Sequence, residues 1–132
     1  MIGALVNRLA KRAKPPQQPV APAPVVLDEK YLANVANLVG REALQALAGS
    51  FQTELHQRLA AITAPEAACG TIEREAHALA SLAGNLGLVE LSACSRQLTD
   101  TCRSAAEGDI PRRMRALNEA AERAVARLET VP

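Results

Sequence analysis

Two histidines are the residues of this sequence best suited to nucleophilic chemistry near neutral pH. A free imidazole has a pKa of about 6.5, so near pH 7 it is largely an unprotonated nucleophile that can accept a phosphoryl group and release it. His77 is followed at helical spacing by Ser81 and Gly84, whereas His56 lies beside Leu55 without comparable small neighbours. His77 is therefore the candidate nucleophile, and His56 is predicted to be a surface or boundary residue.

A helical wheel places His77 on the outer face of its helix. At about 100° per residue, the apolar face falls within about 40° of Ile72, and His77 lies about 140° away from it. That apolar face also contains Ala76, Leu79, Ala83 and Leu86. Arg74, Ser81 and Gly84 share the outer face with His77, and the small side chains would let a bulky partner approach the imidazole.

The sequence offers no obvious second catalytic group, nucleotide loop or metal site. No acid or thiol stands in a persuasive triad with His77, and no G-x-x-x-x-G-K-[ST] loop occurs. Cys69, Cys94 and Cys102 are odd in number and lack C-x-x-C spacing, so neither a disulfide framework nor a metal site is indicated. We expect these cysteines to fill space in the core, with no metal bound. The residue pattern alone thus predicts that His77 is accessible, but it does not indicate a function.

The stretch from Ala76 to Gly87, AHALASLAGNLG, resembles the signature of histidine-containing phosphotransfer (HPt) domains, A-H-x-L-K-G-x-A-x-N-x-G or close to it. The residues that match in register are Ala76, His77, Leu79, Ala83, Asn85 and Gly87. The resemblance covers roughly residues 26 to 130 and implies that His77 carries the phosphoryl group. It places Arg74, Ala80, Ser81 and Gly84 at the docking surface, while Asn85 and Gly87 shape the end of the helix.

Two positions depart from the family pattern. Ala80 and Ser81 stand where the family usually has lysine and glycine. Without the lysine, a cation that would stabilise phosphoryl charge near the imidazole is missing. Ser81 is still small, so access to His77 should survive. We hypothesise that Arg74, one turn earlier, partly replaces the lysine; an unchanged transfer rate in Arg74→Ala would refute this.

The resemblance implies a phosphorelay with the receiver domain of a response regulator or with a hybrid histidine kinase. The receiver would supply Mg²⁺ and the catalytic groups, so the chain would be a phosphocarrier without a cofactor of its own and not an enzyme. One alternative is a docking module that binds a receiver or kinase without being phosphorylated, for which Ala80 is the main argument. Another is a helical adaptor in which His77 is incidental.

Hydrophobic periodicity predicts five helices, at about residues 29–39, 41–62, 64–85, 88–107 and 110–130. Short loops between the four longer helices favour antiparallel neighbours, so the predicted fold is an all-α, antiparallel, up-and-down four-helix bundle with a short additional N-terminal helix. The stripe of the second helix contains Leu44, Leu47, Phe51, Leu55, Leu59 and Ile62. That of the fourth contains Leu91, Cys94, Leu98 and Cys102.

Turn and capping residues set the expected helix ends. Asp28 is the predicted N-cap of the first helix, and Thr63 with Glu66 forms a predicted capping box for the third. Asn85-Leu86-Gly87 ends the third helix, and Gly108-Asp109 ends the fourth and caps the last. The last helix mixes five arginines with three glutamates, a pattern typical of a solvated face.

Length and composition bound the class of protein. The chain has 132 residues, of which 48% are hydrophobic and 22% charged, enough for one folded domain and a tail. Aromatic residues make up 2%, which leaves almost no platform for base stacking, and we expect no nucleic-acid partner. No apolar run is long enough to span a bilayer and the start of the chain lacks the layout of a cleavable signal, so we expect a cytoplasmic protein. A bundle with one outward-facing site can work alone, and we therefore expect a monomer.

Charge and proline content divide the chain into three parts. Residues 1–14 form a predicted short basic amphipathic segment that could make weak contact with a membrane or a scaffold. Residues 15–25 are a proline-rich linker, and residues 26–132 are the predicted bundle domain. Residues 25–132 carry 11 basic and 14 acidic side chains, which argues against general affinity for nucleic acid.

Overall fold

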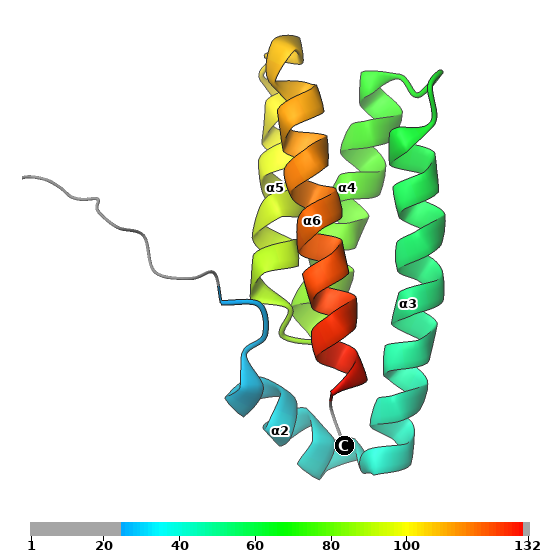
Figure 1. Ribbon diagram of the computed structural model, residues 1–132, viewed down its shortest axis with the longest axis vertical. Helices are drawn as coiled ribbons and strands as arrows, with labels where there is room; N and C mark the ends of the chain where they lie inside the picture. The colour runs from blue at the N-terminus through cyan, green and yellow to red at the C-terminus, as the bar shows by residue number, and fades with distance from the viewer. Residues whose placement is uncertain (1–24, 131–132) are drawn as a thin grey trace, which may run out of the picture.

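The computed structural model describes residues 25–130, which contain five α-helices and no strand. The helices are α2 (Glu29–Val39), α3 (Arg41–Thr63), α4 (Cys69–Asn85), α5 (Val89–Arg103) and α6 (Ile110–Glu129), and the short 3-10 helix η1 (Glu107–Asp109) precedes α6. The four long helices run up and down beside one another, and α2 crosses one end of them (Figure 1). This confirms the predicted fold class. The predicted segment 1–14 lies outside the described residues, and so does the predicted linker 15–25 except for Val25.

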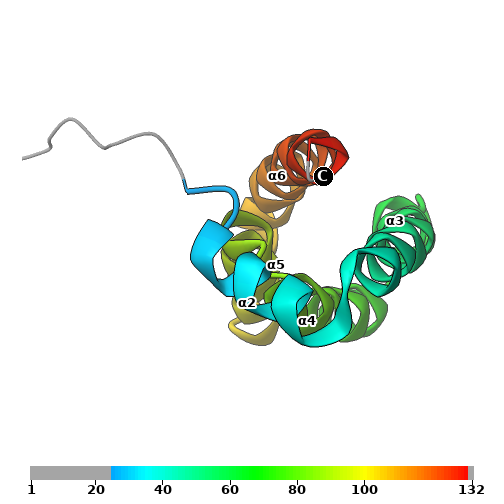
Figure 2. The ribbon, with the colours of Figure 1, turned by 90° about the horizontal axis from the view of Figure 1, so that it is seen from below.

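The core lies among the four long helices. Seen along the bundle, α4 and α5 lie between α3 and α6 (Figure 2), and α4 packs most extensively against α5. Leucine and alanine dominate the buried side chains, and the most deeply buried include Leu55, Ile62, Leu79, Leu88, Leu91, Leu98 and Leu117. Small alanines on α4 and α6 let neighbouring helices approach closely. Contacts between α3 and α6 are sparse, and a groove of about 550 Å³ lies between them.

Helix α2 is bonded to the C-terminal end of α4. The Asp28 carboxylate accepts a hydrogen bond from the Tyr31 backbone N–H at 3.0 Å, which confirms Asp28 as the N-cap. The Tyr31 hydroxyl donates to the backbone carbonyl of Asn85 at 3.2 Å, and the Asp28 backbone N–H donates to the carbonyl of Gly87 at 2.8 Å. These bonds fix α2 against the turn that follows α4.

The start of α4 differs from the prediction. Thr63 is the last residue of α3, and its hydroxyl donates to the Leu59 carbonyl at 2.8 Å, so it caps no following helix. Ala64 is extended with ψ of 135° because the proline ring of Pro65 disfavours helical geometry in the residue before it. The predicted capping box is therefore wrong, and α4 begins at Cys69 without a side-chain cap.

The end of α5 also differs from the prediction. The helix stops at Arg103, and Ala105 rather than a glycine adopts positive φ, at 62°. The Ala106 backbone N–H donates to the Thr101 carbonyl at 3.3 Å, which satisfies one of the free carbonyls at the helix end. Gly108 lies in the 3-10 helix that leads to α6, and Asp109 makes no side-chain cap bond.

Most of the predicted apolar stripe of α3 is buried, but Leu47 is 45% exposed. Arg58 of α3 bonds Glu75 of α4 at 2.8 Å, and this antiparallel register places Leu47 at the level of Leu86, just past the last residue of α4. On the helical wheel of α3, Leu47 lies about 60° from Leu44 and Ile62, at the edge of the buried arc, which accounts for its exposure. Leu59 and, on α5, Cys94 are half-buried.

Candidate functional site

His77 lies in the middle of α4 with an exposed side chain. The opposite face of the helix is buried and contains Ile72, Ala76, Leu79 and Ala83. This arrangement follows from the 3.6-residue period, because the apolar residues recur every three or four positions and leave residue 77 outside their arc. The imidazole is thus accessible to a partner on a well-supported helix.

A pocket of about 200 Å³ lies beside His77, between α4 and α5. Its α4 side consists of His77, Ala80 and Ser81, and its α5 side of Arg96, Thr99, Asp100 and Arg103. These α5 residues are not among the site residues predicted from the sequence. Residues 96, 99, 100 and 103 are spaced three or four positions apart in the sequence, and this spacing places them on one face of α5. When α4 and α5 pair as an antiparallel hairpin, that face lies opposite His77.

The two arginines of this pocket differ in their partners. Arg103 bonds the Glu73 carboxylate of α4, with 2.6 Å between Nε and Oε2, and this hydrogen bond raises the pKa of Arg103 above its ordinary value. Arg96 forms no ion pair with any residue in the described part of the chain. Since Asp100 is the single acid lining the pocket, the lining side chains present a small positive excess.

Ala80 was expected at the docking surface, but its side chain is buried, with only 5% exposed. The Ser92 hydroxyl of α5 donates to the Ala80 backbone carbonyl at 2.9 Å, so this part of α4 faces α5. On the wheel Ala80 lies only about 80° from Ile72. Helix α4 packs between α3 and α5, and its buried arc is therefore wider than that of a helix with one neighbour. Ala80 borders the pocket without offering much surface to a partner.

The other residues expected at the docking surface are exposed. Ser81 lines the pocket beside His77, and Gly84 lies one turn beyond Ser81 along α4. A Cβ added to Gly84 would lie 3.7 Å from the Ser92 hydroxyl, an ordinary contact distance. Arg74 is also exposed but does not line the pocket. Its proposed role in place of the family lysine stays a prediction.

Gly87 and Asn85 form the turn that ends α4. Gly87 has φ of +73°, and an added Cβ would come within 2.9 Å of the Tyr31 ring. Glycine is needed here both for its backbone conformation and for the close approach of α2. Asn85 is the last residue of α4, and its backbone carbonyl accepts the hydrogen bond from Tyr31. Gly87 thus shapes the helix end, whereas a role for the side chain of Asn85 stays a prediction.

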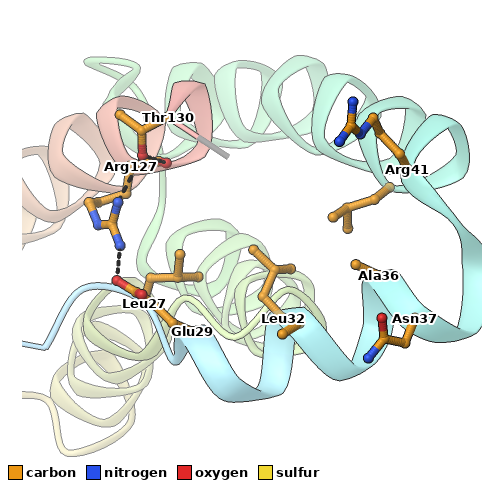
Figure 3. A pocket seen from close by; sticks show the side chains of 10 residues that line it. Leu27, Glu29, Leu32, Ala36, Asn37, Arg41, Arg127 and Thr130 are labelled. Carbon is orange, nitrogen blue, oxygen red and sulfur yellow. Dashed lines mark hydrogen bonds and ion pairs between the residues drawn. The ribbon is translucent and has the colours of Figure 1, made fainter. Parts of the chain in front are cut away.

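The largest apolar pocket near the α2 end of the bundle contains none of the expected site residues. It has about 510 Å³ and lies between α2, the start of α3 and the end of α6. Figure 3 shows Leu27 and Leu32 pointing into it, with Arg127 and Arg41 at its two ends. Arg127 is paired with Glu29 across the gap between α6 and α2.

The cysteines pack in or near the core. Cys102 is buried, and the Cys69 thiol donates to its backbone carbonyl at 3.6 Å. Burial, reinforced by the neighbouring Cys69 thiol, raises the pKa of Cys102 to about 12, and burial also raises the pKa of Cys94. Within residues 25–130 no three His, Cys, Asp or Glu side chains gather as a metal site.

The described part of the chain is thus a helical bundle with an exposed imidazole in the middle of one long helix. Residues 40–129 match the family model of the Hpt domain. The chain therefore belongs to the Hpt domain family, whose members are phosphocarriers, not enzymes, in two-component signalling and interact with receiver domains and kinases. Searches of curated proteins and of solved structures gave no match. Among the described helices none is long and apolar enough to cross a membrane.

Proposed function

We propose that this protein accepts a phosphoryl group on His77 from the phosphorylated receiver domain of a response regulator and passes it on to another receiver. The observation that carries the proposal is the position of His77. It is exposed in the middle of α4, beside a pocket lined by Arg96 and Arg103, in a chain that belongs to the Hpt family. Membership supports phosphotransfer in general, and the surroundings of His77 support this residue as the carrier.

The transfer is an exchange of one bond for another. The unprotonated imidazole nitrogen of His77 attacks the phosphorus of the receiver's acyl phosphate, a nitrogen–phosphorus bond forms, and the phosphorus–oxygen bond to the receiver aspartate breaks. The aspartate leaves as a carboxylate, and the phosphorylated imidazole keeps its N–H, so no proton is gained or lost. Mg²⁺ and the other catalytic groups belong to the receiver. The reverse step returns the phosphoryl group to a second receiver.

His56 is the other histidine within the matched residues, and its surroundings are less suitable. It borders the groove between α3 and α6, together with the carboxylates of Glu122 and Glu129. These negative charges would repel a phosphoryl group, and no arginine lines that groove. His77 borders a pocket lined by two arginines and one acid, Asp100, and we therefore assign the phosphoryl group to it.

The donor can also be the receiver of a hybrid histidine kinase, because the same acyl phosphate chemistry applies. One outward-facing histidine needs no second copy of the chain, so we propose a monomer. Receiver domains and kinases of this kind act in the cytoplasm, and we place the protein there. The described part of the site requires no metal or organic cofactor of its own for the nucleophilic step.

The test is phosphotransfer from a panel of phosphorylated receiver domains in the presence of Mg²⁺, followed by intact mass analysis. We expect one acid-labile phosphoryl group on the wild-type protein and on His56→Gln, and none on His77→Gln. Stable binding of a receiver without transfer would replace the proposal by that of a docking module. Absence of both binding and transfer across the panel would refute it.

A further inference from the structure

We propose that Arg96 of α5 binds the phosphoryl group on His77, in the role of the cation that Ala80 does not supply. The inference rests on the proposed function and adds a residue from a different helix. Arg96 and His77 line the same pocket of about 200 Å³, on opposite sides of the contact between α4 and α5. The short side chain of Ala80, which is only 5% exposed, lines the same pocket.

The register of the two helices brings Arg96 to the level of His77. Ser92 lies opposite Ala80, because its hydroxyl bonds the Ala80 carbonyl, and Cys102 lies opposite Cys69 further along the hairpin. In an antiparallel pair, the residue about three positions before Ala80 faces the residue about three positions after Ser92. His77 therefore faces the turn of α5 that contains Arg96. Arg96 is exposed, so its guanidinium can move toward a group on the imidazole.

Arg96 is a better candidate than the other arginines near His77. Arg103 is bonded to Glu73 at 2.6 Å, and a carboxylate at that distance offsets the attraction of Arg103 for a second anion. Arg74 lies outside the pocket. Arg96 has no ion-pair partner within the described residues, although Asp100 lies one turn further along α5. A planar guanidinium also matches the geometry of phosphoryl oxygens better than an ammonium group does.

The buried position of Ala80 explains why the cation comes from α5. A lysine at position 80 would have to run through the pocket to reach the phosphoryl oxygens, whereas alanine leaves that space open. The side chain of Arg96 enters the same space from the opposite wall. The phosphoryl group would then contact a cation of α5 while covalently attached to α4.

The experiment compares Arg96→Ala and Arg74→Ala with Arg115→Ala, which removes an exposed arginine of α6 outside the pocket. Each variant is phosphorylated by the same receiver, and the transfer rate is measured. The receiver is then removed and the lifetime of the phosphohistidine is followed by intact mass. We expect Arg96→Ala to lower both the rate and the lifetime on the order of tenfold. The Arg115→Ala protein should behave as the wild type.

A second variant tests whether a lysine at position 80 can replace Arg96 as the cation of the pocket. Adding Ala80→Lys to Arg96→Ala should restore most of the lost rate and lifetime, because it returns a positive charge to the same pocket. Loss of rate with an unchanged lifetime would assign Arg96 to receiver docking and overturn the inference. A larger effect of Arg74→Ala than of Arg96→Ala would also overturn it. If the wild-type protein accepts no phosphoryl group from any receiver, the proposed function itself fails.

Discussion

The hydroxyl of Ser92 donates a buried hydrogen bond to the backbone carbonyl of Ala80, 2.9 Å away. It joins α5 to α4 one turn from His77, at a place where Ser92 is 4% exposed and Ala80 is 5% exposed. The bond fixes the register of the two helices whose facing side chains form the pocket beside the histidine. The position of His77 relative to Arg96 therefore depends on it.

Ser92→Ala should lower the free energy of unfolding by about 1 kcal/mol, the usual value of one internal hydrogen bond. The matched control is Ser50→Ala, because Ser50 is exposed on α3 and this change alters only helix propensity. Urea denaturation of both variants measures the difference. Equal stability of the two variants would show that the Ser92 bond contributes nothing to the pairing of α4 with α5.

Gly87→Ala should destabilise the fold by roughly 2 kcal/mol or more, since alanine disfavours φ of +73° and its Cβ would meet the Tyr31 ring at 2.9 Å. Gly49→Ala on α3 should instead stabilise it by about 0.5–1 kcal/mol, because no atom lies within 4 Å of the added Cβ and alanine favours a helix. Thermal and urea unfolding distinguish the two. A Gly87→Ala protein as stable as the wild type would contradict the requirement for glycine at this turn.

Ser81→Phe should block phosphotransfer while leaving the fold intact. Ser81 is exposed beside His77, so a benzyl group would occupy the space that an approaching receiver needs. We expect the transfer rate to fall on the order of a hundredfold, as when reacting groups cannot reach their productive positions. Ser50→Phe, on the exposed surface of α3, serves as the control and should transfer normally. Normal transfer by Ser81→Phe would place the docking surface elsewhere on the bundle.

The stability of the protein should fall above about pH 8.5 because of Cys102. Its pKa is raised to about 12 in the folded state, mainly by burial, whereas a thiol in the unfolded chain has a pKa of about 8.5. The neutral thiol favours folding below the lower value, and this contribution is lost as the pH rises toward the higher one. The loss at pH 10 is on the order of 1–2 kcal/mol.

Urea denaturation at pH 7.5 and pH 10 measures this effect in the wild type and in Cys102→Ala. The variant should lose less stability between the two pH values, since it lacks the Cys102 thiol and every other titratable group is common to both proteins. Identical losses would refute the assignment to Cys102.

Periodicity predicted the helices and the exposure of His77 because both depend on contacts close in sequence. The Asp28 cap and the Gly87 turn were predicted for the same reason, since their side chain and backbone requirements are local. The capping box at Thr63 was wrong because its hydroxyl has two possible partners. It bonds the carbonyl of Leu59 in the preceding turn instead of an N–H in the next helix.

The parts of the site that depend on two helices were not predicted. Ala80 is buried because α4 packs between α3 and α5. A helical wheel drawn for α4 alone identifies the apolar face, but it does not show that a second helix covers the residues beside that face. The arginines of α6 show the same limit. Most of the arginines and glutamates of α6 are exposed as predicted. However, Arg123 donates to both Glu90 oxygens of α5 at 2.9 and 2.6 Å and Arg127 pairs with Glu29 of α2, and the pattern of α6 alone does not indicate these contacts with other helices.

Helix α2 precedes the residues that match the Hpt family, yet it is bonded to the turn after α4 through Tyr31 and Asp28. Trimming the chain to the matched residues, 40–129, would remove the buried side chains of Leu27 and Leu32 and uncover Leu44 and Leu86 beside them. The stretch that matches the family model is therefore shorter than the unit that folds. Transplanting this phosphocarrier into a fusion protein requires the sequence from about residue 27 onward, with α2 included as part of the domain.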